Sequence, residues 1–172
     1  MKQRLKLIVI PSAIIAAAFA VSGCSDGYSN SWPYPEEVKT VYVEMFDSQS
    51  FRRDHEYVLT DAVCKRIEAQ TPYKIVSDRD IADSLLTGRI ENVYSATLTM
   101  ERESGTPLQT EAKVKVVFDW KDLQNGKMLL SDEKVFATAN YSSFMGQTFE
   151  YAADIAVNRA AQLIVERMQK EF

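Results

Sequence analysis

The spacing of apolar and polar residues changes several times along this chain, and each spacing predicts a different element. Residues 39–46 alternate strictly, which is typical of a β-strand, and residues 73–76 indicate a second, short strand. In the first strand Val41, Val43 and Met45 share one side, opposite Tyr42, Glu44 and Phe46. Between the two strands, residues 55–70 repeat apolar side chains every three or four positions, which predicts an amphipathic helix. Its expected buried stripe is Leu59, Ala62, Val63 and Ile67.

A long β-hairpin follows, formed by residues 89–101 and 110–120 around the turn at 103–106. Even-numbered positions carry most of the apolar side chains, so we expect one core face and one wet face. The expected core set is Ile90, Tyr94, Ala96, Leu98 and Met100, then Ala112, Val114, Val116, Phe118 and Trp120. The expected wet set is Val93, Ser95, Thr97 and Thr99, then Glu111, Lys113, Lys115 and Val117.

The remaining sequence predicts one more strand and a closing helix. Asn125-Gly126 marks a turn that leads into a strand from Met128 to about Tyr141. The alternation of this strand slips between Leu130 and Val135, which indicates a β-bulge. After a loop at 140–147, a helix is expected from about Thr148 almost to Phe172. Its apolar stripe is Ala152, Ile155, Ala156, Ala160, Leu163 and Ile164.

The resulting order is β-α-β-β-β-β-α. Each helix has one apolar stripe and each long strand one apolar face, which favours a two-layer α+β sandwich. We therefore predict two helices packed on one face of a mainly antiparallel, four- to five-stranded sheet, in a single domain over residues 38–172.

The first residues have the pattern of an exported protein. A basic start and a short apolar run are typical of a signal peptide, predicted here over residues 1–23. The sequence Val21-Ser22-Gly23-Cys24 resembles the lipobox of bacterial lipoproteins, in which the Cys is lipidated and becomes the first mature residue. The alternative is an ordinary signal peptide with an incidental Cys.

Lipidation of Cys24 would anchor the chain to a membrane through acyl chains such as palmitate. Residues 24–37 are rich in turn formers and are expected to be a tether, with Trp32 and Tyr34 either packed on the domain or placed near lipid head groups. Ser25 follows the Cys instead of the Asp that tends to retain such lipoproteins at the inner membrane. The expected location is therefore the periplasmic side of the outer membrane.

Charge and cysteine content narrow the possible functions. Removal of a leader that carries Lys2, Arg4 and Lys6 but no acid takes the net charge from −4 to −7. Such an acidic chain is a poor binder of nucleic acid. If Cys24 carries lipid, Cys64 has no disulfide partner, and its helical spacing places it near the core.

The sequence contains little that indicates catalysis. His55 is the only histidine, so His-based triads and multi-His metal sites are excluded within one chain. No nucleophile elbow, phosphate-binding loop or dinucleotide fingerprint is present. Asp78-Arg79-Asp80 could bind a metal or simply cap a turn. We expect no metal, no cofactor and no enzymatic activity.

The wet face of the hairpin is the most informative surface. Its hydroxyl groups and two close lysines could meet a polar partner or an anionic head group; the alternative is a merely solvated sheet face. The candidate contacts are Lys113, Lys115, Arg89 and Thr97.

Taken together, these segments resemble the LptE (RlpB) family of lipopolysaccharide-assembly lipoproteins. The resemblance rests on the lipobox with Gly27-Tyr28, the strand at 38–46, the segment 82–90 (Ala-Asp-Ser-Leu-Leu-Thr-Gly-Arg-Ile), the long hairpin, the turn Asn125-Gly126-Lys127 and the Ala-rich closing helix. It implies a non-enzymatic partner of the outer-membrane β-barrel LptD, which plugs the barrel lumen and helps to place lipopolysaccharide in the outer leaflet.

A second hypothesis is an envelope lipoprotein that binds and regulates a periplasmic enzyme such as a peptidoglycan synthase. Such a protein would share the anchor, but it would usually need a long disordered tether to cross the periplasm. The interval at 25–37 is short for that role.

Overall fold

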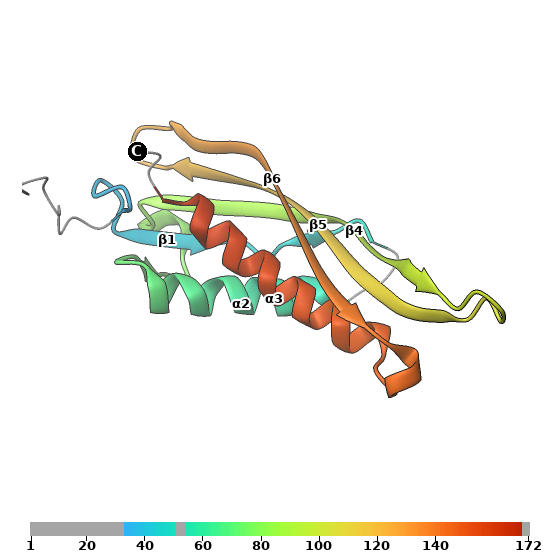
Figure 1. Cartoon of the computed structure of the whole chain (residues 1–172). Coiled ribbons are helices and arrows are strands. Elements are labelled where there is room, and N and C mark those ends of the chain that lie inside the picture. The colour runs from blue at the N-terminus through green and yellow to red at the C-terminus, as the bar shows by residue number, and fades with distance from the viewer. Residues whose placement is uncertain (1–32, 51–53, 170–172) are drawn as a thin grey trace, which may run out of the picture. The chain divides into compact units, whose positions relative to one another are not determined.

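Six strands form one sheet in the computed structural model, which describes residues 33–50 and 54–169, and both long helices cover the same face of it (Figure 1). The strands are β1 (Thr40–Val43), β2 (Asp47–Ser48), β3 (Lys74–Ile75), β4 (Ser84–Met100), β5 (Pro107–Asp122) and β6 (Met128–Tyr141). The helices are α2 (His55–Gln70) and α3 (Phe149–Arg167), with short 3-10 turns at η1 (Arg79–Ile81) and η2 (Ser143–Met145).

The sheet order is β3-β1-β4-β5-β6, with β2 also paired to β4. The three long strands run antiparallel, whereas β1, β2 and β3 pair in parallel. This confirms the α+β sandwich with two helices on one face. The sheet has six strands instead of the predicted four to five, because a short strand, β2, forms directly after the segment 39–46 that was expected to be the first strand.

The break between β1 and β2 lies at Phe46. The side chain of Phe46 is buried in the core, whereas that of Met45 is 55% exposed, so the strand alternation predicted through residue 46 stops early. The ring of Phe46 lies against Gly88 of β4, where an added Cβ would collide with it and would lie 2.8 Å from the carbonyl oxygen of Val117. The glycine of the segment 82–90 is therefore required by close packing.

The two helices differ in how well their sequences predict them. The expected stripe of α2 is buried, and both ends of the helix match the prediction. The buried stripe of α3 is rotated from the predicted one, because Ile155 and Leu163 are only partly buried at its margin. The fully buried set is Ala152, Ala153, Ala156, Val157, Ala160, Ala161, Ile164 and Val165.

A bulge in β4 reverses the predicted faces of residues 92–97. Ile90 pairs with Val116 and Asn92 with Lys115, so Glu91 is an extra residue in the ladder. Beyond it, Val93 is buried on the helix side and Tyr94 is 45% exposed on the other. The assignment of Tyr94 to the core and of Val93 to the wet face was therefore wrong, since one extra residue moves the side chains that follow it to the opposite face, here as far as the next register shift after Thr97.

The bulge predicted in β6 is confirmed. Phe118 pairs with Glu133 and Trp120 with Leu130, so β6 uses one residue more than β5 over this interval. Asp132, within the bulge, has a φ of 52° and donates its backbone N–H to the carboxylate of Asp119.

A network of hydrogen bonds around Asp83, which we name the proximal clasp, joins the starts of β1 and β4 to the β5–β6 turn. The carboxylate of Asp83 accepts hydrogen bonds from the backbone N–H groups of Lys39 (3.1 Å) and Thr40 (2.9 Å) and from the side-chain amide of Gln124. Burial opposes the ionised form of Asp83, but the hydrogen bonds from Thr40, Lys39 and Gln124 outweigh it and lower the pKa of this carboxyl. Nearby, the indole of Trp120 donates to the hydroxyl of Ser84 at 3.1 Å.

Candidate functional site

The strand register places three of the four predicted contact residues on one face of the sheet. Lys113 and Lys115 alternate with the buried residues of β5. Arg89 pairs with Val117, which lies two residues beyond Lys115 and so on the same face. All three side chains therefore point away from the helices. Thr97 instead pairs with Thr110, which is buried on the helix side. Its predicted position beside the lysines was therefore wrong, again because of the bulge at Glu91.

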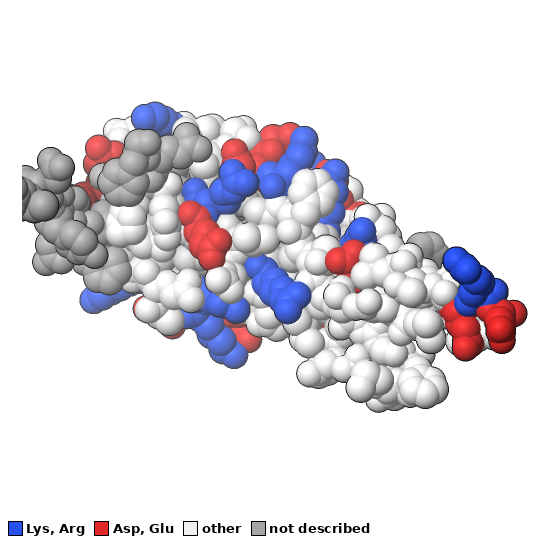
Figure 2. Space-filling view, viewed as in Figure 1, with Lys and Arg blue, Asp and Glu red and all other residues white. Residues whose placement is uncertain are grey.

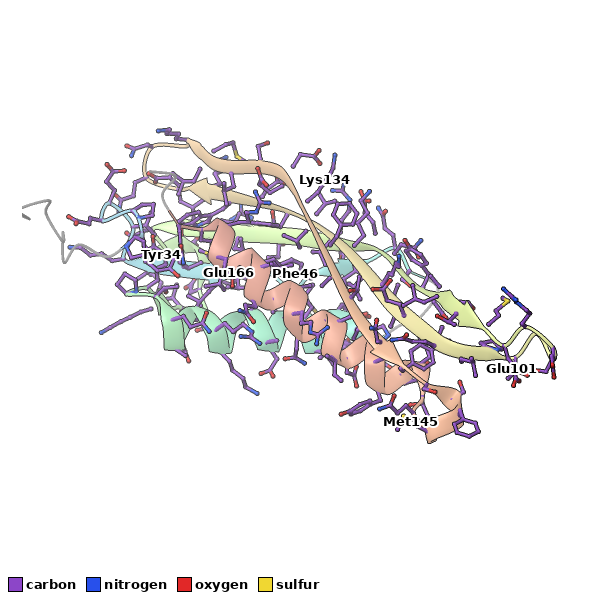
Figure 3. The ribbon with its side chains drawn as sticks, in the orientation of Figure 1. Tyr34, Phe46, Glu101, Lys134, Met145 and Glu166 are labelled. Atoms are coloured by element: carbon purple, nitrogen blue, oxygen red, sulfur yellow. The ribbon has the colours of Figure 1, made fainter. Side chains whose placement is uncertain are left out.

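The two lysines are not free cations, because each forms an ion pair with a carboxylate. The ammonium of Lys113 lies 3.0 Å from Glu111, and that of Lys115 contacts Glu91. Hydrogen bonds from these lysines lower the pKa of both carboxyl groups. Lys134 is paired in the same way with Asp132 at 2.9 Å. Figure 2 shows acidic and basic side chains intermixed at the upper edge of the view, where Lys134 lies in Figure 3.

Two aromatic side chains interrupt this charged surface and enclose a shallow groove. Phe136 of β6 is 64% exposed, and the ammonium of Lys115 lies 5.7 Å from its ring centroid. Together with Tyr94 of β4, it borders a depression of about 380 Å³. We name this the outer groove; its polar and aromatic lining residues are Asn92, Tyr94, Lys113, Lys115, Phe136 and Thr138.

A different surface lies at the far end of the hairpin, which extends past the helices (Figure 1). Phe144 is 90% exposed and Met145 is 76% exposed, both in η2. Figure 3 shows Met145 and the hairpin residue Glu101 at the same end of the domain, opposite Tyr34, and Figure 2 shows a mainly uncharged surface below the hairpin tip. We name this surface the distal apolar end; it consists of the exposed residues Leu98, Met100, Leu108, Phe144 and Met145.

The loop that presents Phe144 and Met145 is held by specific hydrogen bonds. The hydroxyl of Ser142 donates to the carbonyl oxygen of Leu108 in β5 at 3.0 Å. The backbone N–H of Ser142 donates to the side-chain oxygen of Gln147 at 2.9 Å. A cavity of about 510 Å³ between this loop and the hairpin is lined by Glu101, Thr106, Pro107, Leu108, Ser143 and Phe144. The sequence assigned Leu98 and Met100 to the core, which was wrong because neither α2 nor α3 covers them (Figure 1). The aromatic and Met residues of the loop at 140–147 were the available signal for this surface.

Comparison with protein families identifies the chain. The family model described as LptE, lipopolysaccharide-assembly, matches residues 38–171. The chain belongs to the LptE family. This confirms the resemblance stated from the sequence and places the function of the chain in lipopolysaccharide assembly.

Solved structures with the same fold include two described as lipoprotein B. Rare lipoprotein B from Shewanella oneidensis is 18% identical, with a TM-score of 0.53 and coverage of 76% of this chain and 93% of that one. An uncharacterised lipoprotein B from Nitrosomonas europaea is 15% identical, with a TM-score of 0.56 and coverage of 79% and 84%. The hypothetical protein CT253 from Chlamydia trachomatis gives 10% identity, a TM-score of 0.56 and coverage of 76% and 95%. None of the curated proteins matches this LptE-family sequence significantly.

Several other sequence predictions can be compared with the structure. Tyr34 of the expected tether packs on the domain, with its ring 5.7 Å from that of Tyr73, whereas Cys24 and Trp32 lie outside the described residues. Asp78 caps η1 by accepting a hydrogen bond from the N–H of Asp80, as the capping alternative proposed. Cys64 is half-buried on α2, and burial raises the pKa of its thiol.

Residues 33–50 and 54–169 contain neither a metal-binding cluster nor a membrane-spanning helix. This part of the LptE-family chain contains no cluster of three or more His, Cys, Asp or Glu side chains that could hold a metal ion. None of its helices combines the length and apolar character needed to span a bilayer.

Proposed function

We propose that this chain is a non-enzymatic outer-membrane lipoprotein, anchored through Cys24, that partners and plugs the LptD barrel and assists insertion of lipopolysaccharide into the outer leaflet. The observation that carries the proposal beyond the family assignment is the distal apolar end. Exposed apolar clusters on a soluble domain mark binding surfaces, and here the loop that bears Phe144 is fixed by Ser142. Lipopolysaccharide has acyl chains that such a surface would bind.

The sheet face supports a position inside a barrel. The lumen of an outer-membrane barrel is polar and contains water. The face that carries Lys113, Lys115 and Arg89 bears several paired charges, so it can remain hydrated or meet a polar wall. These three residues, with Thr97 from the opposite face, are the candidate contacts to lipopolysaccharide or to the barrel.

Affinity purification of the full chain from detergent-solubilised envelope tests the partnership. We expect recovery of a large β-barrel. Recovery of a peptidoglycan synthase without a barrel would contradict the proposal and favour the regulatory hypothesis.

The distal apolar end is tested by Phe144→Asp in a lipopolysaccharide-binding assay. Loss of a buried phenyl contact should weaken binding about 10-fold or more, since such burial contributes about 1.5–3 kcal/mol. The matched control is Tyr57→Asp, an exposed aromatic on α2 that does not belong to the distal apolar end. Equal binding by both variants and the wild type would exclude the distal end as the lipid contact.

A further inference from the structure

We infer that the outer groove is a saccharide-binding site, in which Tyr94 and Phe136 stack on sugar rings while the paired charges between them bind the hydroxyl groups. The inference rests on the proposed function for the source of the sugar, which is the saccharide part of lipopolysaccharide. It concerns a surface separate from the distal apolar end.

The first argument is the placement of the aromatic rings. Phe136 and Tyr94 are exposed on a sheet face whose exposed side chains are mainly polar or charged, and the core lies on the opposite face of the sheet. Their rings therefore make no contribution to the main core. The C–H faces of a sugar ring are apolar and pack well on an aromatic ring, while the hydroxyl groups around the edge remain free for hydrogen bonds.

The second argument is that the groove supplies both donors and acceptors. Each lysine is paired with a carboxylate, so a ligand meets ammonium and carboxylate groups side by side. A sugar hydroxyl both donates and accepts, and it fits such a pair without breaking it. A phosphate would have to displace the carboxylates of Glu91 and Glu111 from the lysines or lie against them, which like-charge repulsion opposes. The ion pairs thus favour sugar hydroxyls over phosphate.

The third argument is the rigidity of the arrangement. The groove residues occupy two adjacent cross-strand rows, Asn92–Lys115–Phe136 and Tyr94–Lys113–Thr138. Residues on neighbouring strands hold fixed spacings, and a site built on strands is more precise than one built on loops. The volume of about 380 Å³ lies within the range of small-molecule sites, about 300–1,000 Å³.

The test uses the full mature chain in detergent and a lipid-free, dephosphorylated oligosaccharide released from lipopolysaccharide, titrated by calorimetry. Phe136→Ala and Tyr94→Ala should each weaken binding about three- to tenfold, the range expected for the loss of one stacking contact. Phe136→Tyr should retain binding, and Tyr57→Ala on α2 serves as the control. Because the interaction is not charge-driven, raising the salt concentration should change the affinity little.

The outcomes separate this inference from the proposed function. If the wild type binds intact lipopolysaccharide but not the oligosaccharide, or if Phe136→Ala and Tyr94→Ala bind it normally, the saccharide site is wrong and the proposed function stands. If the oligosaccharide binds with the expected losses but no barrel is recovered from the envelope, the saccharide site stands and the proposed function falls. Binding that disappears at high salt would show that ionic contacts, and not ring stacking, hold the oligosaccharide, and would also overturn the inference.

Discussion

The two ends of the β4–β5 hairpin are built from the same strands and have opposite surfaces. At the proximal end, Leu86 and Trp120 are buried beneath the helices and the clasp at Asp83 satisfies the polar groups of three segments. At the distal end, Leu98 and Leu108 are exposed, and the hydrogen bond from Ser142 to Leu108 holds a loop that displays further apolar groups. The difference comes from the helix layer, which covers one end only.

This contrast indicates a division of roles within one sheet. Burial against α2 and α3 supplies the stability of the domain at the proximal end. The distal end lacks that burial, so its apolar residues remain available for a partner. Substitutions should therefore affect folding at one end and binding at the other.

The sharpest test compares two leucines of β4. Leu86→Ala removes a fully buried side chain and should lower the free energy of unfolding by about 2–5 kcal/mol. Leu98→Ala, on the exposed part of the same strand, should change it by less than about 0.5 kcal/mol. Urea unfolding of both variants measures the difference, and equal losses would show that the distal end also belongs to the core.

A second prediction concerns Gly88. Gly88→Ala forces a methyl group against the Phe46 ring and the Val117 carbonyl, and this overpacking should cost about 1–3 kcal/mol. The comparison is Gly105→Ala at the hairpin tip, where an added Cβ meets nothing within 4 Å but φ is +67°. That substitution should cost about 1–2 kcal/mol through backbone strain alone. Only Gly88→Ala should be partly relieved in a Phe46→Leu background, as a double-mutant cycle would show.

The proximal clasp predicts a dependence of stability on pH. The hydrogen bonds from Thr40, Lys39 and Gln124 lower the pKa of Asp83 in the folded state, so its contribution is present above the ordinary Asp pKa and is lost as the pH falls through the folded value. Asp83→Asn should have a lower thermal midpoint than the wild type at pH 7. Its midpoint should also fall less than that of the wild type on acidification. The control is Glu103→Gln at the distal tip, which makes the same charge change. If Glu103→Gln alters the pH dependence of stability as much as Asp83→Asn does, the clasp is not the cause of that dependence.

The smallest effect on folding is expected from Lys113→Gln combined with Lys115→Gln. Both ion pairs lie on the sheet surface, where such pairs contribute little to stability, so the thermal midpoint should stay close to that of the wild type. Binding should change instead, in the oligosaccharide titration or in barrel recovery. If the folded double variant still binds the oligosaccharide and still recovers the barrel as the wild type does, this face contacts only solvent.

The sequence predicts the elements better than the surfaces. The period of α2 is set by large residues such as Leu59 and Ile67, so its buried face is unambiguous. In α3, adjacent alanines such as Ala152-Ala153 fit either of two neighbouring stripes, and only packing selects one. Alternation in a strand shows which residues share a face, but it cannot show where the helix layer stops. For that reason Leu98 and Met100 were assigned to the core.

The bulge at Glu91 behaves like a frameshift within a strand. A second register shift lies between Thr97 and Thr99, so only the interval 92–97 is displayed in the opposite phase. Tyr94 reaches the outer groove because of this interval, and Val93 reaches the core for the same reason. Deletion of Glu91 would join Ile90 directly to Asn92 and make the ladder regular, so Val93 and Tyr94 would keep their faces while Lys115 would lose its carboxylate partner. The place of Tyr94 in the outer groove thus depends on which residue β4 leaves out of the ladder, and a count of alternating positions along the sequence does not contain that information.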